Sequence, residues 1–316
     1  MSEAILHNES PAVDVIAPSG GYTSGEVLQL CDGRAAYVQG LRDPAANEAV
    51  SLQTEGQVKL TKLATKSVLD GGKLYWDRSA GSATPIKTAD SFYLGVAVGD
   101  AAQAATTVIC ALNVQPAYAI ELGKGPWVSA ASNGEGVSLV SLAGSELKLS
   151  FDAVAEVAMA AIYSGDTVPC ADGPILEAQV AIYDIGDNAA LDINVGLANA
   201  THATDFDQVT EAVAIHLDGN SLAINAESDD GTTEVAATDT TKVAVDDTYF
   251  EVWIDCRDID DIQIYIDGVN VLPATVFKLD AATGPLLAIA HIEKTSNDTT
   301  ADVRVKSMTV RTTDLT

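Results

Sequence analysis

One short segment of the chain holds two carboxylates that flank a tryptophan. Glu251, Trp253 and Asp255 alternate with apolar residues, so these three side chains share one face of an extended segment. A carboxylate pair could serve as acid and nucleophile in glycoside hydrolysis. Residues i and i+4 of a strand, however, lie roughly 13 Å apart at about 3.3 Å per residue, whereas such pairs need about 5 Å or, for inversion, less than about 10 Å. No catalytic residue is therefore predicted, and the chain is expected not to be an enzyme.

The same segment indicates a milder chemistry, which is sugar binding. Trp253, and Tyr265 in the next strand-like run, could stack on a sugar ring if their faces are exposed. The alternative is that both rings fill the protein interior or face solvent singly. Glu251, Trp253, Asp255 and Tyr265 are therefore the candidate glycan-binding residues.

Acidic residues gather in two turn-like segments, within residues 255–261 and 227–230. Calcium takes several carboxylate and carbonyl oxygens from loops of this kind. No Asp-x-Asp-x-Asp-Gly loop is present, and the histidines are scattered without a pair at ligand spacing: His7, His202, His216 and His291. Solvated acidic turns are the better interpretation, so neither a metal site nor a cofactor is predicted.

The segments that must position these residues are short β-branched and aromatic runs separated by Gly, Asp and Ser turns. Such runs predict strands, and helical patterns are scarce, so the predicted fold class is all-β. In residues 262–266 every second residue is isoleucine, and Asp267-Gly268 then turns the chain. The apolar parity changes between Val305 and Met308, which predicts a bulge or the end of a strand there. For residues 154–163, strand and helical turn remain alternatives.

The strand-like runs fall into two groups, and a chain of 316 residues favours two domains. Residues 26–115 predict a small, closed or nearly closed antiparallel β barrel with a hairpin turn at Asp32-Gly33. Residues 116–126 predict a connector. Residues 127–316 contain strands at regular spacing, which predicts a two-sheet sandwich.

Residues 1–25 predict an N-terminal arm, in which turn material surrounds one short apolar run. That run either pairs with a neighbouring chain or forms a strand on the barrel of its own chain. The candidate interface residues of the arm are Val13, Val15, Ile16 and Tyr22.

One close group of positive charges stands out in the chain, formed by Lys59, Lys62 and Lys66. A solvated face is one interpretation. The other is contact with an acidic partner surface, where complementary charge sets register and speeds association.

The charge and the cysteines exclude several classes of partner and compartment. The formal net charge is -28 at pH 7, so neither nucleic acid nor an anionic membrane is an expected partner. Through Gln115 there are 8 basic and 12 acidic residues, which leaves 17 − 8 = 9 basic and 45 − 12 = 33 acidic residues beyond it. The four cysteines are widely spaced and indicate no disulfide framework, and no signal peptide is evident.

Several segments of the first group carry a resemblance. Gly71-Gly-Lys-Leu-Tyr-Trp-Asp77, a Ser/Gly turn, Leu94-Gly-Val-Ala-Val98 and Thr106-Thr-Val-Ile-Cys-Ala-Leu112 resemble a family of tailed-phage proteins that includes head-decoration, or cement, proteins. The resemblance covers roughly the first third of the chain. It implies a structural virion protein, made in the bacterial cytoplasm, that decorates and stabilises the outer capsid surface. Its implied partners are the major capsid protein and further copies of the chain, as a trimer or, alternatively, a dimer.

A second resemblance lies in residues 125–316. Glu251-Val-Trp-Ile-Asp255, Ile264-Tyr-Ile-Asp-Gly268 and Asp302-Val-Arg-Val-Lys-Ser-Met-Thr-Val310 resemble the concanavalin-like jelly rolls, which include lectins, laminin-G-like modules and some glycosidases. The resemblance implies a jelly-roll β sandwich. A fold of this kind does not by itself define a function, so a module that attaches the virion to host surface glycans is the alternative function.

Overall fold

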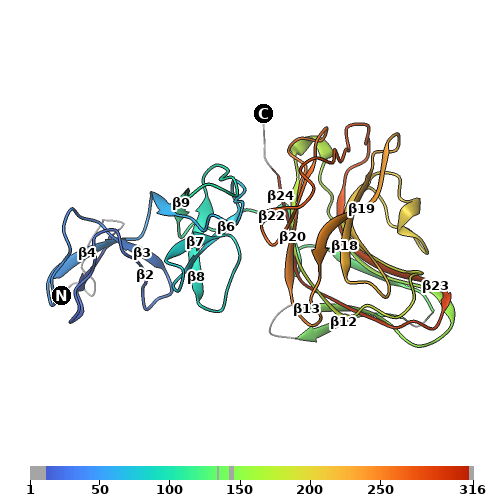
Figure 1. Ribbon diagram of the computed structural model, residues 1–316, viewed down its shortest axis with the longest axis horizontal. Helices are drawn as coiled ribbons and strands as arrows, with labels where there is room; N and C mark the ends of the chain where they lie inside the picture. Colours follow the sequence, from blue (N-terminus) through green and yellow to red (C-terminus); the bar gives the residue numbers. More distant parts are fainter. Residues whose placement is uncertain (1–11, 134, 142–145, 313–316) are drawn as a thin grey trace, which may run out of the picture. The chain divides into compact units, whose positions relative to one another are not determined.

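The protein is described by a computed structural model that covers residues 12–133, 135–141 and 146–312. The chain forms two compact units, Met1–Pro116 and Ala117–Thr316 (Figure 1). In the described residues the helices are two single 3-10 turns, η1 (Cys170–Asp172) and η2 (Phe206–Gln208). The predicted all-β class is therefore confirmed. Neither turn in this part of the chain is long or apolar enough to cross a membrane.

The first unit begins with a four-stranded antiparallel sheet in the order β1-β4-β3-β2. Its strands are β1 (Ala12–Ile16), β2 (Val27–Gln29), β3 (Ala35–Val38) and β4 (Ala49–Gln53). β1 pairs with β4 of the same chain, from Ala12 opposite Gln53 to Ile16 opposite Ala49. The apolar run of the predicted arm is thus an edge strand of its own sheet. Residues 1–11 of that arm lie outside the described residues.

A five-stranded sheet in the order β5-β9-β8-β6-β7 completes the first unit. Its strands are β5 (Gln57–Thr61), β6 (Lys73–Asp77), β7 (Ser82–Thr84), β8 (Ser91–Ala97) and β9 (Thr107–Leu112). Its two edges meet at one isolated parallel bridge between Lys62 and Ala83, where the Leu63 N–H donates to the Ala83 carbonyl at 2.9 Å. A single bridge is not a ladder, so this barrel is not closed.

The prediction of one barrel over residues 26–115 needs correction, because the strands divide between two sheets. β4 and β5 follow one another in the chain but pair with different partners, β4 with β1 and β3, and β5 with β9. The chain changes sheet at Gly56, whose φ of 98° suits a residue without a Cβ. The hairpin at Gly33 (φ 89°) does form and joins β2 to β3.

Asn113 joins the two sheets of the first unit. Its Nδ2 donates to the carbonyls of Ala35 (2.9 Å) and Thr54 (2.7 Å), and the Ala35 N–H donates to its Oδ1 (2.9 Å). Asn113 has a φ of 59°, a left-handed conformation that asparagine tolerates better than most residues. These three bonds attach the end of β9, a strand of the five-stranded sheet, to the four-stranded sheet.

The second unit contains two antiparallel sheets. One has eight strands, in the order β12-β13-β24-β15-β20-β21-β22 with β10 beside β24. These strands are β10 (Ile120–Glu121), β12 (Gly136–Ser141), β13 (Glu146–Phe151), β15 (Ile175–Asp184), β20 (Phe250–Asp255), β21 (Gln263–Ile266), β22 (Val269–Asn270) and β24 (Ala301–Arg311). β10 lies within the predicted connector, so part of residues 116–126 belongs to this sheet.

The other sheet has seven strands, in the order β11-β14-β23-β16-β17-β18-β19. They are β11 (Trp127–Ala131), β14 (Glu156–Ser164), β16 (Leu191–Ala198), β17 (Ala212–Asp218), β18 (Ala223–Asp229), β19 (Glu234–Val243) and β23 (Leu287–Asn297). Alternate side chains from both sheets fill one apolar core between them. The unit is thus the predicted jelly-roll sandwich, and β14 shows that residues 156–164 are strand.

Two local predictions for this unit are confirmed. The isoleucines of residues 262–266 are buried in the core, and the turn after them has positive φ at Asp267 (50°) and Gly268 (71°). In β24, Ser307 stands opposite Gln179 while Val305 stands opposite Val180, so one residue is bulged between Val305 and Ser307.

Candidate functional site

The four residues predicted to bind a glycan lie together on β20 and β21, but their aromatic rings are buried. Trp253 stands opposite Tyr265 with ring centroids 5.9 Å apart, and the two residues are 5% and 9% exposed. Asp255 is buried too and accepts hydrogen bonds from Arg257 Nε (2.9 Å) and Nη2 (2.6 Å). Glu251 is partly buried. Neither ring offers an open face for stacking on a sugar. Both rings instead fill the protein interior, which is one of the alternatives that the sequence left open.

The three lysines of the first unit do not form one exposed group. Lys59 is exposed on β5 and Lys66 is partly buried, but Lys62 is only 3% exposed. Lys62 Nζ donates to the carbonyls of Leu63 (3.0 Å), Gln103 (3.3 Å) and Lys66, and burial lowers the pKa of this amine. Its ammonium group therefore satisfies main-chain oxygens instead of facing a partner.

The candidate interface residues of the predicted arm also differ in their surroundings. Val15 and Tyr22 pack against the small core of the four-stranded sheet, and Val13 is partly buried. Ile16 is 63% exposed. Of these residues, Ile16 offers the largest apolar surface for a partner.

A pocket of about 470 Å³, which we call the His216 pocket, lies on the outer face of the seven-stranded sheet. Strand alternation creates this face: Ile193, Val213, Ile215 and Ile224 point into the core, so their neighbours point outward. The pocket is lined by His216 and six carboxylates, namely Asp192, Asp207, Asp218, Glu227, Asp229 and Glu234. No lysine or arginine is among the described residues that line it. The pocket is thus strongly anionic.

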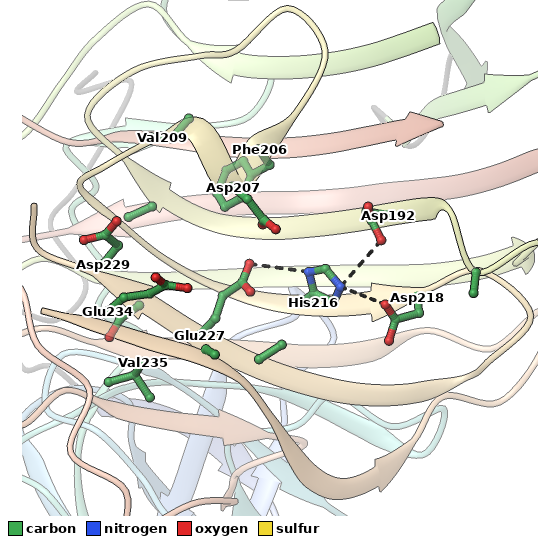
Figure 2. A pocket seen from close by; sticks show the side chains of 15 residues that line it. Asp192, Phe206, Asp207, Val209, His216, Asp218, Glu227, Asp229, Glu234 and Val235 are labelled. Atoms are coloured by element: carbon green, nitrogen blue, oxygen red, sulfur yellow. Dashed lines mark hydrogen bonds and ion pairs between the residues drawn. The ribbon is translucent and has the colours of Figure 1, made fainter. Parts of the chain in front are cut away.

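His216 lies at the centre of the pocket and contacts side chains from three strands (Figure 2). Its Nε2 is 3.3 Å from Asp218 Oδ1 on β17 and 3.7 Å from Asp192 Oδ1 on β16. Its Nδ1 is 3.0 Å from Asn194 Oδ1 on β16 and 3.5 Å from Glu227 Oε1 on β18. Asn194 is the direct partner of His216 on β16, whereas Asp192 and Glu227 are its diagonal neighbours on β16 and β18.

Burial and charge act in opposite directions on this cluster. Burial lowers the pKa of His216, but the carboxylates of Glu227, Asp218 and Asp192 outweigh it and raise this pKa to about 9. Burial raises the pKa of Asp192 to about 7, although the charge of His216 opposes this change. At neutral pH the imidazole therefore holds its proton among the acids.

A second buried pair, His291 and Glu293 on β23, holds the segment that forms one side of the pocket. His291 Nε2 is 2.7 Å from Glu293 Oε2, which also accepts the Phe206 N–H at 2.7 Å. Burial lowers the pKa of His291 to about 4 and raises that of Glu293 to about 8. The pair is therefore neutral around pH 7, and it holds η2, which supplies Phe206 and Asp207 to the pocket.

Sequence reasoning missed this cluster because it searched for ligand spacing along the chain. His216 and Asp218 alternate on one strand, and this His-x-Asp pattern was the one local signal. Asp192 and Glu227 come from neighbouring strands, so their contribution depends on sheet register.

Comparison with known proteins gives one family match, which lies in the first unit. Residues 7–112, about a third of the 316 residues, match the model of a family described as phage cement protein. The resemblance found in this part of the sequence is therefore confirmed. No curated protein matches the chain.

Three solved structures illustrate the likenesses of the chain, and all three are distant. The carbohydrate recognition domain of Emp47p is 10% identical over 59% of this chain and 88% of that chain, with a TM-score of 0.42. A β-1,3-glucanase from Mycobacterium marinum is 13% identical over 62% and 99%, with a TM-score of 0.39. An uncharacterized protein from Mycobacterium paratuberculosis is 13% identical over 61% and 100%, with a TM-score of 0.43. Likenesses at this level leave the function of the chain open.

Proposed function

We propose that this chain decorates and stabilises the outer surface of a phage capsid, with the first unit as its docking part. The observation that carries the proposal is the match of residues 7–112 to the phage cement family. The role is structural and not enzymatic. The protein is made in the cytoplasm of the bacterial host and acts on the virion.

The physical basis of stabilisation is binding that favours the assembled shell. Each copy bridges neighbouring major capsid subunits and buries surface that is exposed again when they separate, so mass action shifts the shell toward its intact state. Many copies supply the effect, and we propose a homotrimer, with a dimer as the alternative.

The distribution of charge supports this division of roles. The second unit carries most of the acidic excess, since 33 of the 45 acidic residues lie beyond Gln115. A large charge of one sign repels neighbouring copies, so the second unit is expected to stand in solvent. Ile16 and Lys59, both exposed, are the candidate contacts of the first unit.

Co-sedimentation with undecorated, expanded phage heads tests the proposal. The full-length chain is expected to pellet with heads to a saturating stoichiometry. The double variant Lys59→Glu, Lys66→Glu is expected to need several-fold more protein for the same occupancy, because reversed charges at a contact slow association. A chain that never pellets with heads contradicts the proposal.

Lys124→Glu is the matched control for this charge reversal. Lys124 lies in the second unit, its side chain is 75% exposed, and its ion pair with Glu121 (2.9 Å) is a surface contact of small energetic value. This variant is expected to pellet like the wild type. Equal loss in the control and in the double variant would indicate a general charge effect instead of docking through the first unit.

A second candidate function is glycan binding by the second unit, and the observation that favours it is the His216 pocket. Its carboxylate oxygens offer several acceptors for sugar hydroxyl groups within about 470 Å³. A glycan array probed with the full-length chain and with Glu234→Gln, which alters an exposed wall of the pocket, tests this function. Binding that Glu234→Gln leaves unchanged would place the sugar elsewhere.

A further inference from the structure

We propose that the His216 pocket binds one divalent cation of the zinc class, with His216 Nε2 and the carboxylates of Asp192 and Asp218 as its protein ligands. Nothing in the proposed capsid role requires this site, so the two proposals stand or fall separately.

The distances among the three ligand atoms fit a shared ion. The contributing atoms of Asp192, His216 and Asp218 all lie within 4.8 Å of one another. From Nε2 the carboxylate oxygens are 3.3 Å (Asp218) and 3.7 Å (Asp192) away. Ligands bound at about 2.0–2.2 Å in a tetrahedral site are about 3.4 Å apart, so rotamer shifts of a few tenths of an ångström complete the coordination.

Asn194 sets the orientation of the imidazole. It is fully buried, and its Oδ1 lies 3.0 Å from His216 Nδ1. With Nδ1–H donating to Asn194, the lone pair of Nε2 faces Asp192 and Asp218. Histidines that bind metal commonly donate their other ring N–H to an oxygen in this way, and such contacts fix the tautomer and the ring.

A separate observation indicates that the site takes a further occupant. The amide Nδ2 of Asn194 is buried on the same outward-facing side and has no hydrogen-bond partner in the described structure. A buried donor without an acceptor is destabilising. The missing acceptor is an oxygen, such as that of a bound water molecule on this face of the sheet. The Asn194 side chain thus orients His216 through its Oδ1, while its Nδ2 remains able to donate to a further oxygen.

The charge of the residues that line the pocket favours a cation. Six carboxylates and one imidazole line it, and no basic residue is among the described lining residues. A proton on His216 supplies one positive charge, and a divalent cation that displaces this proton supplies two. The imidazole nitrogen favours borderline ions such as zinc and cobalt over calcium and magnesium, which prefer all-oxygen sites.

Such an ion would connect two strands and keep positions for further ligands. Asp192 lies on β16, whereas His216 and Asp218 lie on β17. Three protein ligands leave at least one coordination position open toward the pocket. Water, or a hydroxyl or carboxylate oxygen of a bound molecule, can take that position.

The test is calorimetric titration of zinc sulfate into untagged, chelator-treated, full-length protein. We expect one zinc ion per chain, with calcium and magnesium binding at least tenfold more weakly. His216→Gln and Asp218→Asn are each expected to lower zinc affinity at least tenfold. Asp192→Asn serves the same purpose if either of these variants does not fold, as judged by circular dichroism.

Glu234→Gln is the matched control, because it removes one negative charge from the same pocket without removing a proposed ligand. It is expected to change zinc affinity less than threefold. Cobalt(II) absorption provides a second readout, since a band of nitrogen-ligated, low-coordinate cobalt should appear in the wild type and disappear in His216→Gln. Absence of zinc binding, or equal affinity in wild type and His216→Gln, would overturn the proposal in favour of a protonated His216 as the sole positive charge.

Discussion

Lys62 illustrates how far a single residue can depart from its usual environment. Lysine is seldom buried unless its charge is satisfied, and here three main-chain carbonyls surround its Nζ. The sequence indicates a cluster of three lysines but does not show that one of them points inward. Lys62 directly follows the last residue of β5 and lies on the same side as buried Leu60, whereas Thr61 between them is exposed.

Lys62→Met should lower the free energy of unfolding of the first unit by about 1–3 kcal/mol, because carbonyls of Leu63 and Gln103 lose their donor. Lys59→Met, at an exposed position, should change it by less than about 0.5 kcal/mol. Urea unfolding followed by circular dichroism measures both. Equal effects of the two substitutions would contradict the buried role of Lys62.

The lowered pKa of the Glu211 carboxyl predicts how the stability of the second unit changes in acid. Burial raises its pKa, but donors from Thr283 (N–H, 3.0 Å), Gly284 (N–H, 2.9 Å) and Asn199 (Nδ2, 2.8 Å) outweigh burial and hold the pKa below its usual range. A lowered folded-state pKa contributes stability above the unfolded pKa of about 4.3. That stability is lost as the pH falls through the folded pKa.

Glu211→Gln should therefore destabilise the second unit at pH 7 by about 1–3 kcal/mol, since an amide nitrogen would face donors. The gap between wild type and variant should shrink as the pH falls below about 4. Thermal melting from pH 7 to pH 3 measures this gap. A gap that stays constant across this range would show that the carboxylate charge at Glu211 is not what stabilises the loop.

At the level of strands, the alternation of apolar and polar residues predicts which face of a strand is buried. It does not predict which strands pair with one another. The sequence indicates the face alternation of β21, the turn after it and the bulge in β24, because each depends on neighbours in the chain. It does not indicate that β4 and β5 join different sheets. It also does not bring β16, β17 and β18 together around His216, because register between distant strands depends on the packed core.

Gly95 shows how closely two strands approach in the five-stranded sheet. A Cβ at this position would lie 1.9 Å from the carbonyl oxygen of Ala111 in β9, and the backbone has a φ of 150°. Gly95→Ala should therefore separate β8 from β9 and lower the stability of the first unit by about 3 kcal/mol or more.

Gly99→Ala is the control for this substitution. Gly99 also has a positive φ, of 80°, but a Cβ added there would meet no other atom within 4 Å. The substitution should cost about 1 kcal/mol, from backbone conformation alone. Thermal unfolding of both variants separates the steric effect from the conformational one.

For the whole molecule, the division into two units predicts two unfolding transitions. The units have separate apolar cores, and separate cores commonly unfold as separate cooperative units. Differential scanning calorimetry should show two transitions. Gly95→Ala should lower the midpoint of one of them and Glu211→Gln that of the other. A single transition that both substitutions shift equally would contradict this independence.

The Asn113 contacts have a mechanical consequence. Drag on the second unit pulls on the chain just after β9, where the first unit ends. Without a brace, that pull would peel β9 away one hydrogen bond at a time. Asn113 instead passes the load to the main chain at Ala35 and Thr54, so the force is shared by both sheets at once. The rupture force of the first unit should thus depend on the Asn113 side chain as well as on the length of β9.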